Sequence, residues 1–209
     1  MNIAILIYDR FTALDAIGPY EVLSRLPGAS LAFVAAEPGP LTTDNGMLTI
    51  VAERSISEVP APDIVLVPGG PGEVAARAGG PVLEWLQSVH GTTTWTTSVC
   101  TGSLILAAAG LLDGRRATSH WLALEKLAEM GAEPVSERVV FDGKIVTAAG
   151  VSAGIDMALA LAAKVAGVAV AQAIQLGIEY DPQPPFDARS PSKAPAEVVE
   201  ALRTRSRFS

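Results

Sequence analysis

The only cysteine of the chain, Cys100, lies in the stretch TSVCTGSL at residues 97–104. The run before it, TTTWTTSV, has the pattern of a buried strand, and the run after it, TGSLILAAAGLL, has that of a helix. Cys100 is therefore predicted at a strand-to-helix corner, beside the unpaired N–H groups that begin the helix. Those donors and the helix dipole favour an anion, so we expect the thiol pKa to fall and thiolate to accumulate.

A corner of this kind is a nucleophile elbow, in which a tight turn presents a reactive side chain. Gly102 and Ser103 are small, which lets the backbone turn and a substrate approach. The alternative is that Cys100 is a small buried hydrophobic residue. Because ligand sites in α/β sheets lie at the carboxyl ends of the strands, the position of Cys100 favours a functional thiol.

A carboxyl group follows the first predicted strand, in LDAIGPYEVL at residues 14–23. Asp15 stands where a helix begins, so capping of that helix is its ordinary explanation. It also lies at the carboxyl end of a strand, from which it could face Cys100. A carboxylate beside a thiolate is unfavourable, so the two groups would share one proton and act as a coupled acid–base pair.

The glycine-rich stretch PGGPG at residues 68–72 also ends a strand and starts a helix. The N–H groups of Gly69 and Gly70 could turn toward a developing negative charge, as an oxyanion hole requires. A tight turn without further role is the alternative. The spacing matches neither a Rossmann nor a P-loop motif, so it does not indicate phosphate binding.

The chain has two histidines. His90 precedes GTTT in a loop-like region, where we expect it to be solvated. His120, in RRATSHW, could approach Cys100 and form a Cys–His pair. Alternatively, it is a hydrogen-bonded packing residue beside Trp121.

The composition bounds the class of protein. A chain of 209 residues, 49% hydrophobic and 18% charged, is typical of one compact soluble domain. The net charge of −7 argues against nucleic acid as a partner. One cysteine excludes an internal disulfide and any multi-cysteine metal site. The apolar run that opens the chain is too short for a membrane span and lacks the basic region of a signal peptide, so we expect a cytoplasmic protein with no membrane partner.

Short β-branched runs alternate with helix-period segments, which predicts an α/β fold with a mainly parallel sheet and helices on both faces. The predicted strands are 2–8, 30–37, 63–70, 92–99 and 144–150, with a hairpin at 41–53 that turns at Asn45-Gly46. The predicted helices are 15–26, 73–89, 102–111, 120–130, 152–166, 168–179 and 195–206. Prolines in DPQPPFDARSPSKAP, residues 181–195, predict an extended arm that wraps a partner subunit or lies on its own surface.

Four motifs in this order resemble the DJ-1/PfpI superfamily: LDAIGPYEVL, DIVLVPGGPG, TSVCTGSLILAAAGLLDGRRATSHW and AAGVSAGIDMALAL. The resemblance covers about residues 2–180. It implies a flavodoxin-like sandwich and a homodimer, with residues 1–180 as the α/β domain. Residues 181–209 would then be a proline-rich arm and short helix, within that domain or at the dimer interface.

Departures from several branches of the superfamily narrow the function. Class I glutaminases carry a His-x-Glu pair far beyond their cysteine, but no histidine follows His120 here. PfpI-like proteases place a histidine directly after the nucleophile, where this chain has Thr101. Many DJ-1-like members have a glutamate at the position of Asp15. Related transcription regulators append a helix-turn-helix domain, which the 29 residues after Tyr180 cannot supply.

Within the superfamily the motifs, and the tail IEYDPQPPFDARSPSKAP, are similar to isocyanide hydratases. This implies hydration of a small-molecule isocyanide, R–N≡C, to an N-substituted formamide, without metal or organic cofactor. Cys100 would attack the terminal carbon to give a covalent thioimidate, while Asp15 supplies the proton and activates water. Thr101 and the N–H groups of Gly70 and Thr101 would orient substrate or water. Residues expected to line an apolar pocket are Ala149, Gly150 and Val151.

Three other functions fit the same cysteine. A redox-responsive protein would oxidise Cys100 to a sulfinate. A glyoxalase-like or deglycase-like enzyme acting on 2-oxoaldehydes would need a base such as His120. A binding scaffold would retain the elbow as a vestige.

Overall fold

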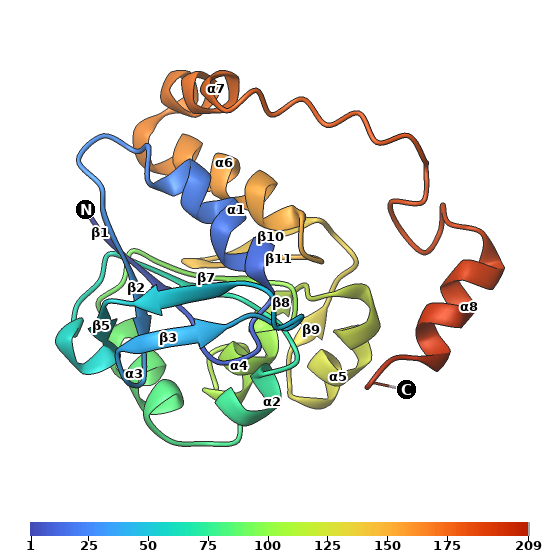
Figure 1. Cartoon of the computed structure of the whole chain (residues 1–209), viewed down its shortest axis with the longest axis horizontal. Coiled ribbons are helices and arrows are strands. Elements are labelled where there is room, and N and C mark those ends of the chain that lie inside the picture. The colour runs from blue at the N-terminus through green and yellow to red at the C-terminus, as the bar shows by residue number, and fades with distance from the viewer. Residues whose placement is uncertain (209) are drawn as a thin grey trace.

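The central sheet is built from the five apolar runs predicted as strands. In the computed structural model, which describes residues 1–208, these runs are mutually parallel neighbours in one seven-stranded sheet (Figure 1). The sheet order is β10-β11-β7-β6-β1-β2-β5. The five strands are β1 (Asn2–Leu6), β2 (Ser30–Ala35), β6 (Ile64–Val67), β7 (Trp95–Val99) and β11 (Ile145–Ala148).

The edges of the sheet hold two strands that the sequence did not reveal. At one edge β5 (Arg54–Ser55) runs parallel to β2. At the other, β10 (Val139–Asp142) runs antiparallel to β11. Every residue of β6 and β11 is buried, as expected of strands covered on both faces.

Helices cover both faces of the sheet, which confirms the predicted flavodoxin-like α/β sandwich (Figure 1). One face carries α1 (Ala13–Leu23), α6 (Ala153–Ala166) and α7 (Val168–Gly177); α1 packs directly on α6. The other face carries α2 (Glu73–Ala76), α3 (Pro81–His90), α4 (Gly102–Ala108) and α5 (Leu124–Glu129).

The predicted single helix over 73–89 is wrong. It is divided into α2 and α3 because Gly79 and Gly80 both have positive φ (126° and 89°), and Pro81 then begins the second helix. The predicted helix 120–130 begins as a 3₁₀ turn, η2 (Trp121–Ala123), before α5. A further 3₁₀ turn, η1 (Ile56–Glu58), follows β5.

The predicted hairpin at 41–53 is confirmed as the antiparallel pair β3 (Gly39–Thr42) and β4 (Thr49–Ala52). A second small pair, β8 (Arg116–Ala117) and β9 (Glu133–Pro134), was not predicted. Within residues 1–208, no helix combines the length and apolar character that a membrane crossing would need.

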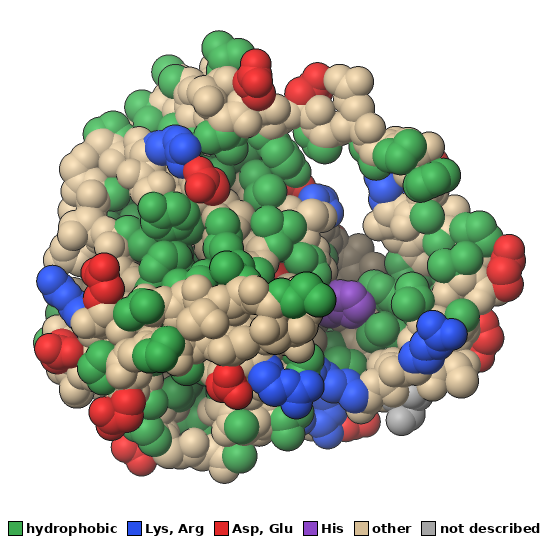
Figure 2. Space-filling model, in the orientation of Figure 1, with side chains coloured by type: hydrophobic (Ala, Val, Ile, Leu, Met, Phe, Trp, Pro, Cys, Tyr) green, Lys and Arg blue, Asp and Glu red, His purple; other side chains and the backbone are tan. Residues whose placement is uncertain are grey.

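The C-terminal arm leaves α7 as an exposed extended segment and leads to α8 (Ala196–Thr204), as predicted from its prolines. Figure 2 shows the arm standing off the body along much of its length. Beyond α8 the chain returns to the body near α5 (Figure 1). The arm therefore brings residues distant in sequence next to the carboxyl edge of the sheet.

Candidate active site

Cys100 occupies the corner between β7 and α4, as the sequence predicted. Its φ is 56°, in the left-handed region that non-glycine residues rarely adopt. Its N–H donates to the carbonyls of Ala148 and Ala149, both at 3.0 Å, and its own carbonyl accepts from the hydroxyls of Ser103 (3.2 Å) and Ser119 (3.0 Å). These four hydrogen bonds hold the backbone of Cys100 in its strained conformation. Strained backbone held in this way is frequent at functional sites.

Three groups surround the sulfur. The N–H groups of Val151 and Thr101 donate to it, and the carboxyl of Asp15 interacts with it. Val151 also has a positive φ, 24°, so a second strained residue aims its amide at the thiol. The thiol is thus enclosed by donors and one acid, with Cys100 only 6% exposed.

The prediction of a low thiol pKa is wrong. Burial, reinforced by the neighbouring Asp15, raises the pKa of Cys100 to about 12, against the opposing effect of the Val151 and Thr101 N–H groups. At neutral pH the sulfur carries its proton, and thiolate does not accumulate.

Asp15 lies in the first turn of α1 but does not cap it; the N-cap residue is Thr12. Its side chain turns into the protein and is fully buried, where Oδ2 accepts the N–H of Gly69 at 2.9 Å. Within residues 1–208, Oδ1 is buried without a hydrogen-bond partner. Burial raises the pKa of Asp15 to about 7, against the hydrogen bonds from Gly69 and Cys100. The carboxyl therefore exchanges its proton in the neutral range.

The glycine stretch positions side chains in this structure. The Gly69 N–H is taken by Asp15, and the Gly70 N–H donates to Thr101 Oγ1 at 3.0 Å. A Cβ at residue 69 would lie 2.5 Å from the Thr101 nitrogen and 3.0 Å from Asp15 Oδ2, so only glycine fits there. Both donors expected to form an oxyanion hole are thus already occupied.

The remaining predicted residues lie around Cys100 in different roles. Ala149 accepts the Cys100 N–H, and Val151 donates to the sulfur. Gly150, between them, faces His120: a Cβ there would lie 2.9 Å from its Cδ2 atom. His120 accepts the Leu122 N–H at 3.4 Å, and the pKa of its ring is lowered by burial and by Arg207. Within the described residues, no hydrogen bond joins His120 to Cys100.

Three residues near the site were not predicted from the sequence. Tyr8 is buried and donates to the Pro68 carbonyl at 2.7 Å; burial, then Asp15, raises its pKa well above the usual range. Glu73 is buried at the start of α2, with Arg77 Nε 2.5 Å from its Oε2. Arg207 reaches the site from the C-terminal segment. Glu73 could have been predicted near the site because it directly follows PGGPG at the end of a strand. Nothing in the sequence around Arg207 indicates that it lies there.

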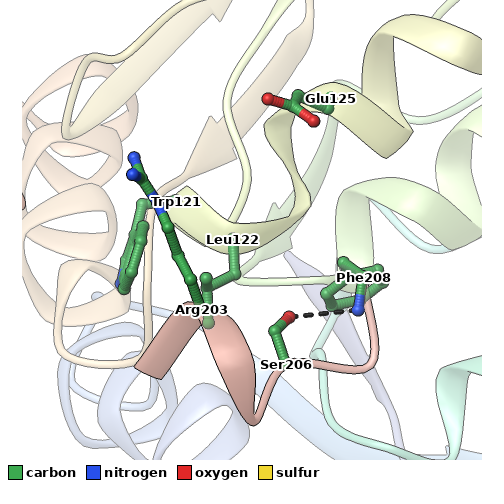
Figure 3. Close-up of a pocket in the computed structure, with 6 residues that line it drawn as sticks. All are labelled: Trp121, Leu122, Glu125, Arg203, Ser206 and Phe208. Carbon is green, nitrogen blue, oxygen red and sulfur yellow. Dashed lines mark hydrogen bonds between the residues drawn. The ribbon is translucent and has the colours of Figure 1, made fainter. Parts of the chain in front are cut away.

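A pocket of about 190 Å³ lies between η2 and α5 on one side and α8 with the residues that follow it on the other (Figure 3). The Arg203 guanidinium lies 6.0 Å from the centre of the Trp121 ring, and Ser206 accepts the Phe208 N–H at 3.0 Å. His120, which faces Gly150, directly precedes Trp121 in the chain and is not among the residues that line this pocket. Its lining residues are Trp121, Leu122, Glu125, Arg203, Ser206 and Phe208.

The raised pKa of Asp15 predicts a pH-dependent stability. The folded state holds this proton more tightly than the unfolded chain, where the pKa is near 3.8, so stability falls as pH rises from about 4 through 7. Between about pH 5 and pH 8.5, we expect wild type to lose roughly 3 kcal/mol of unfolding free energy relative to Asp15→Asn. Urea unfolding of both proteins at the two pH values measures the difference. Parallel pH dependences in the two proteins would contradict an elevated Asp15 pKa.

Comparison with known proteins identifies the family. Residues 1–164 match the model of the DJ-1/PfpI family. The chain belongs to the DJ-1/PfpI family. This confirms the resemblance seen in the sequence. Structural neighbours in the family include a ThiJ/PfpI family protein from Pseudomonas syringae, with a TM-score of 0.95 and 40% identity over 98% of this chain and 85% of that one.

Among curated family members, isonitrile hydratase from Pseudomonas putida is 42% identical over 206 residues, which are 99% of this chain and 90% of that enzyme. Isonitrile is a synonym of isocyanide. DJ-1beta from Drosophila melanogaster shares the fold, with a TM-score of 0.78 at 21% identity over 87% of this chain and 98% of that one. In residues 1–208, His, Cys, Asp and Glu side chains nowhere gather in a group of three that could hold a metal ion.

Proposed function

We propose that this DJ-1/PfpI protein is an isocyanide hydratase, converting R–N≡C and water to an N-substituted formamide through a covalent intermediate on Cys100. The observation that carries the proposal is the buried pair of Cys100 and Asp15, with Asp15 poised to exchange a proton near pH 7. Support also comes from the 42% identity to isonitrile hydratase across 99% of the chain.

The first step adds the thiol across the terminal carbon. Between about pH 7 and pH 12 the pair holds one proton, on sulfur, and Asp15 is a carboxylate. Asp15 accepts the thiol proton as the sulfur attacks and delivers it to the same carbon, giving the thioimidate R–N=CH–S–Cys100. Because the Asp15 carboxylate removes the thiol proton during the attack, the mechanism does not require Cys100 to be a thiolate beforehand.

The second step adds water to the thioimidate carbon. Asp15 accepts a proton from the attacking water and passes it to the nitrogen, giving R–NH–CH(OH)–S–Cys100. As this adduct collapses, the carbon–sulfur bond breaks, and Asp15 carries the hydroxyl proton to the departing sulfur. R–NH–CHO is released, and the thiol and the Asp15 carboxylate are restored. The Val151 and Thr101 N–H groups, which donate to the sulfur, stabilise the negative charge on it as it leaves.

Gly69 and Gly70 act in this scheme by holding Asp15 and Thr101, respectively. Ala149 and Val151 bond the backbone and the sulfur of Cys100, and we expect them, with Gly150 between them, to favour a slim apolar substrate. His120, which bonds Leu122, borders the site without a proton-transfer step assigned to it. The homodimer, the cytoplasmic location and the division at residue 180 stay predictions.

The same observations disfavour the rival functions. Oxidation by peroxide needs thiolate, which burial suppresses at Cys100. An enzyme acting on 2-oxoaldehydes through His120 would need its ring to exchange a proton with Cys100. Its Nδ1 accepts the Leu122 N–H instead, and within residues 1–208 no hydrogen bond joins the ring to Cys100.

The test mixes purified, reduced protein with phenyl isocyanide and follows N-phenylformamide by chromatography, with methylglyoxal as a parallel substrate. We expect catalytic formamide production and no comparable consumption of methylglyoxal. Failure of the intact, reduced protein to produce formamide would refute the proposal for aromatic isocyanides.

A further inference from the structure

The C-terminal segment after α8 carries an arginine into the candidate site. Arg207 Nη2 lies 3.2 Å from the Gly70 carbonyl oxygen, 3.5 Å from Thr101 Oγ1 and 3.3 Å from Glu73 Oε1. Its side chain is 32% exposed, while Glu73 is fully buried. The Arg207 guanidinium therefore packs against the α/β domain beside Gly70 and Thr101, whose neighbours are Gly69, Asp15 and Cys100.

The contact constrains the Thr101 hydroxyl. A hydroxyl has two acceptor positions and one proton. The Gly70 N–H occupies one acceptor position at 3.0 Å, and Arg207 approaches the other at 3.5 Å. The proton is then the only part of the group left to bond, so Thr101 becomes a donor of fixed direction. A cation at its oxygen also makes that proton a stronger donor.

Glu73 anchors the arginine. Its carboxyl is buried and lies between Arg77 Nε, at 2.5 Å, and Arg207 Nη2. Burial raises the pKa of Glu73, while Arg77 and then Arg207 lower it. A buried carboxylate that lacks a cationic partner raises the free energy of the folded state. The charge of Glu73 therefore stabilises the contact between Arg207 and the α/β domain.

We propose that Arg207 is a positioning residue of the hydration, holding Thr101 as a hydrogen-bond donor to the substrate nitrogen. This inference rests on the proposed function. Negative charge develops on that nitrogen when water adds to the thioimidate, and a donor fixed beforehand stabilises it there. Without the guanidinium, the Thr101 hydroxyl can rotate and lose this alignment.

The test compares Arg207→Gln, Arg207→Lys and the control Arg205→Gln with wild type, each as the full chain. Arg205 lies in the same segment and is exposed, and among the described residues its side chain makes no hydrogen bond or ion pair. We expect Arg207→Gln to lower kcat about 10- to 100-fold with little change in KM, because misalignment slows the chemistry more than binding. Arg207→Lys should recover part of the loss, and Arg205→Gln should match wild type.

Two further measurements separate positioning from damage to the fold. Acid-quenched mass spectrometry should show a larger steady-state fraction of Cys100 as thioimidate in Arg207→Gln, because the water step is slowed. With only two histidines in the chain, NMR titration should show a higher pKa for His120 in Arg207→Gln and an unchanged His90.

An unchanged kcat in Arg207→Gln would overturn the inference, as would an equal loss in Arg205→Gln. If wild type makes no formamide, the proposed function fails separately. In that case the His120 titration still tests the contact on which the inference rests. An unchanged His120 pKa in Arg207→Gln would show that Arg207 does not lie at the site.

Discussion

Replacement of Cys100 by alanine should lower formamide production from phenyl isocyanide by at least about 10⁴-fold, because removing a covalent nucleophile eliminates the bond-forming group itself. The fold should survive, since alanine fits the small buried site and the neighbouring serines bond only the backbone carbonyl of residue 100. Initial rates by chromatography, with thermal unfolding of both proteins, measure the two effects.

Ser98→Ala provides a matched control on the same strand. Ser98 is fully buried on β7, and within residues 1–208 its hydroxyl has no hydrogen-bond partner. Removing an unsatisfied buried hydroxyl should leave stability equal or higher and the rate unchanged. Residual turnover in Cys100→Ala within 10-fold of wild type would exclude a nucleophilic role for the cysteine.

The second large effect is expected at Asp15. Asp15→Asn keeps an oxygen that can accept the Gly69 N–H, but the amide cannot exchange a proton with the Cys100 thiol. Loss of a positioned acid–base group costs about 10² to 10⁴ in rate. In wild type the rate should rise with pH through about 7, as Asp15 ionises, and this limb should vanish in the variant.

Asp44→Asn is the control for charge alone. Asp44 raises the pKa of Asp15 without bonding it, and its carboxyl accepts the Thr12 hydroxyl at 2.8 Å. Removing this charge should keep the maximal rate and move the pH limb to lower pH. A full rate in Asp15→Asn with the pH limb intact would assign the proton transfer to another group.

The sheet could be predicted because its strands are short apolar runs bounded by glycine and proline, and a strand buried on both faces needs such a run. The edge strands escaped because their burial is partial: β10 has one buried residue, and β5 has none. The division of helix 73–89 was not predicted because its helix-period pattern outweighed Gly79 and Gly80. Their positive φ prevents one continuous helix between α2, which ends at Ala76, and α3.

The pairing of Cys100 with Asp15 could be predicted because both follow parallel strands at the same edge of the sheet. The direction of the pKa shift of the Cys100 thiol could not be predicted. The helix N-terminus lowers this pKa and burial raises it, and the sequence does not show which effect is larger. A helix N-terminus contributes about 0.3–1 kcal/mol, and α4 has only seven residues. A pKa raised from 9.0 to about 12 corresponds to about 4 kcal/mol, so burial beside a carboxyl prevails.

The contribution of the C-terminal arm could not be predicted from local sequence. Arg207 and Thr101 are 106 residues apart, and no periodicity or motif connects them. Their contact depends on the path of the arm across the body, which prolines make extended but do not direct. Such a contact emerges only from the folded chain.

The covalent mechanism is tested most directly by the mass of the protein during turnover. Wild type mixed with phenyl isocyanide and quenched in acid within milliseconds should gain the mass of one isocyanide, located on the Cys100 peptide. This adduct should decay as N-phenylformamide appears. Formamide production with no mass gain on Cys100 at any quench time would contradict the covalent mechanism.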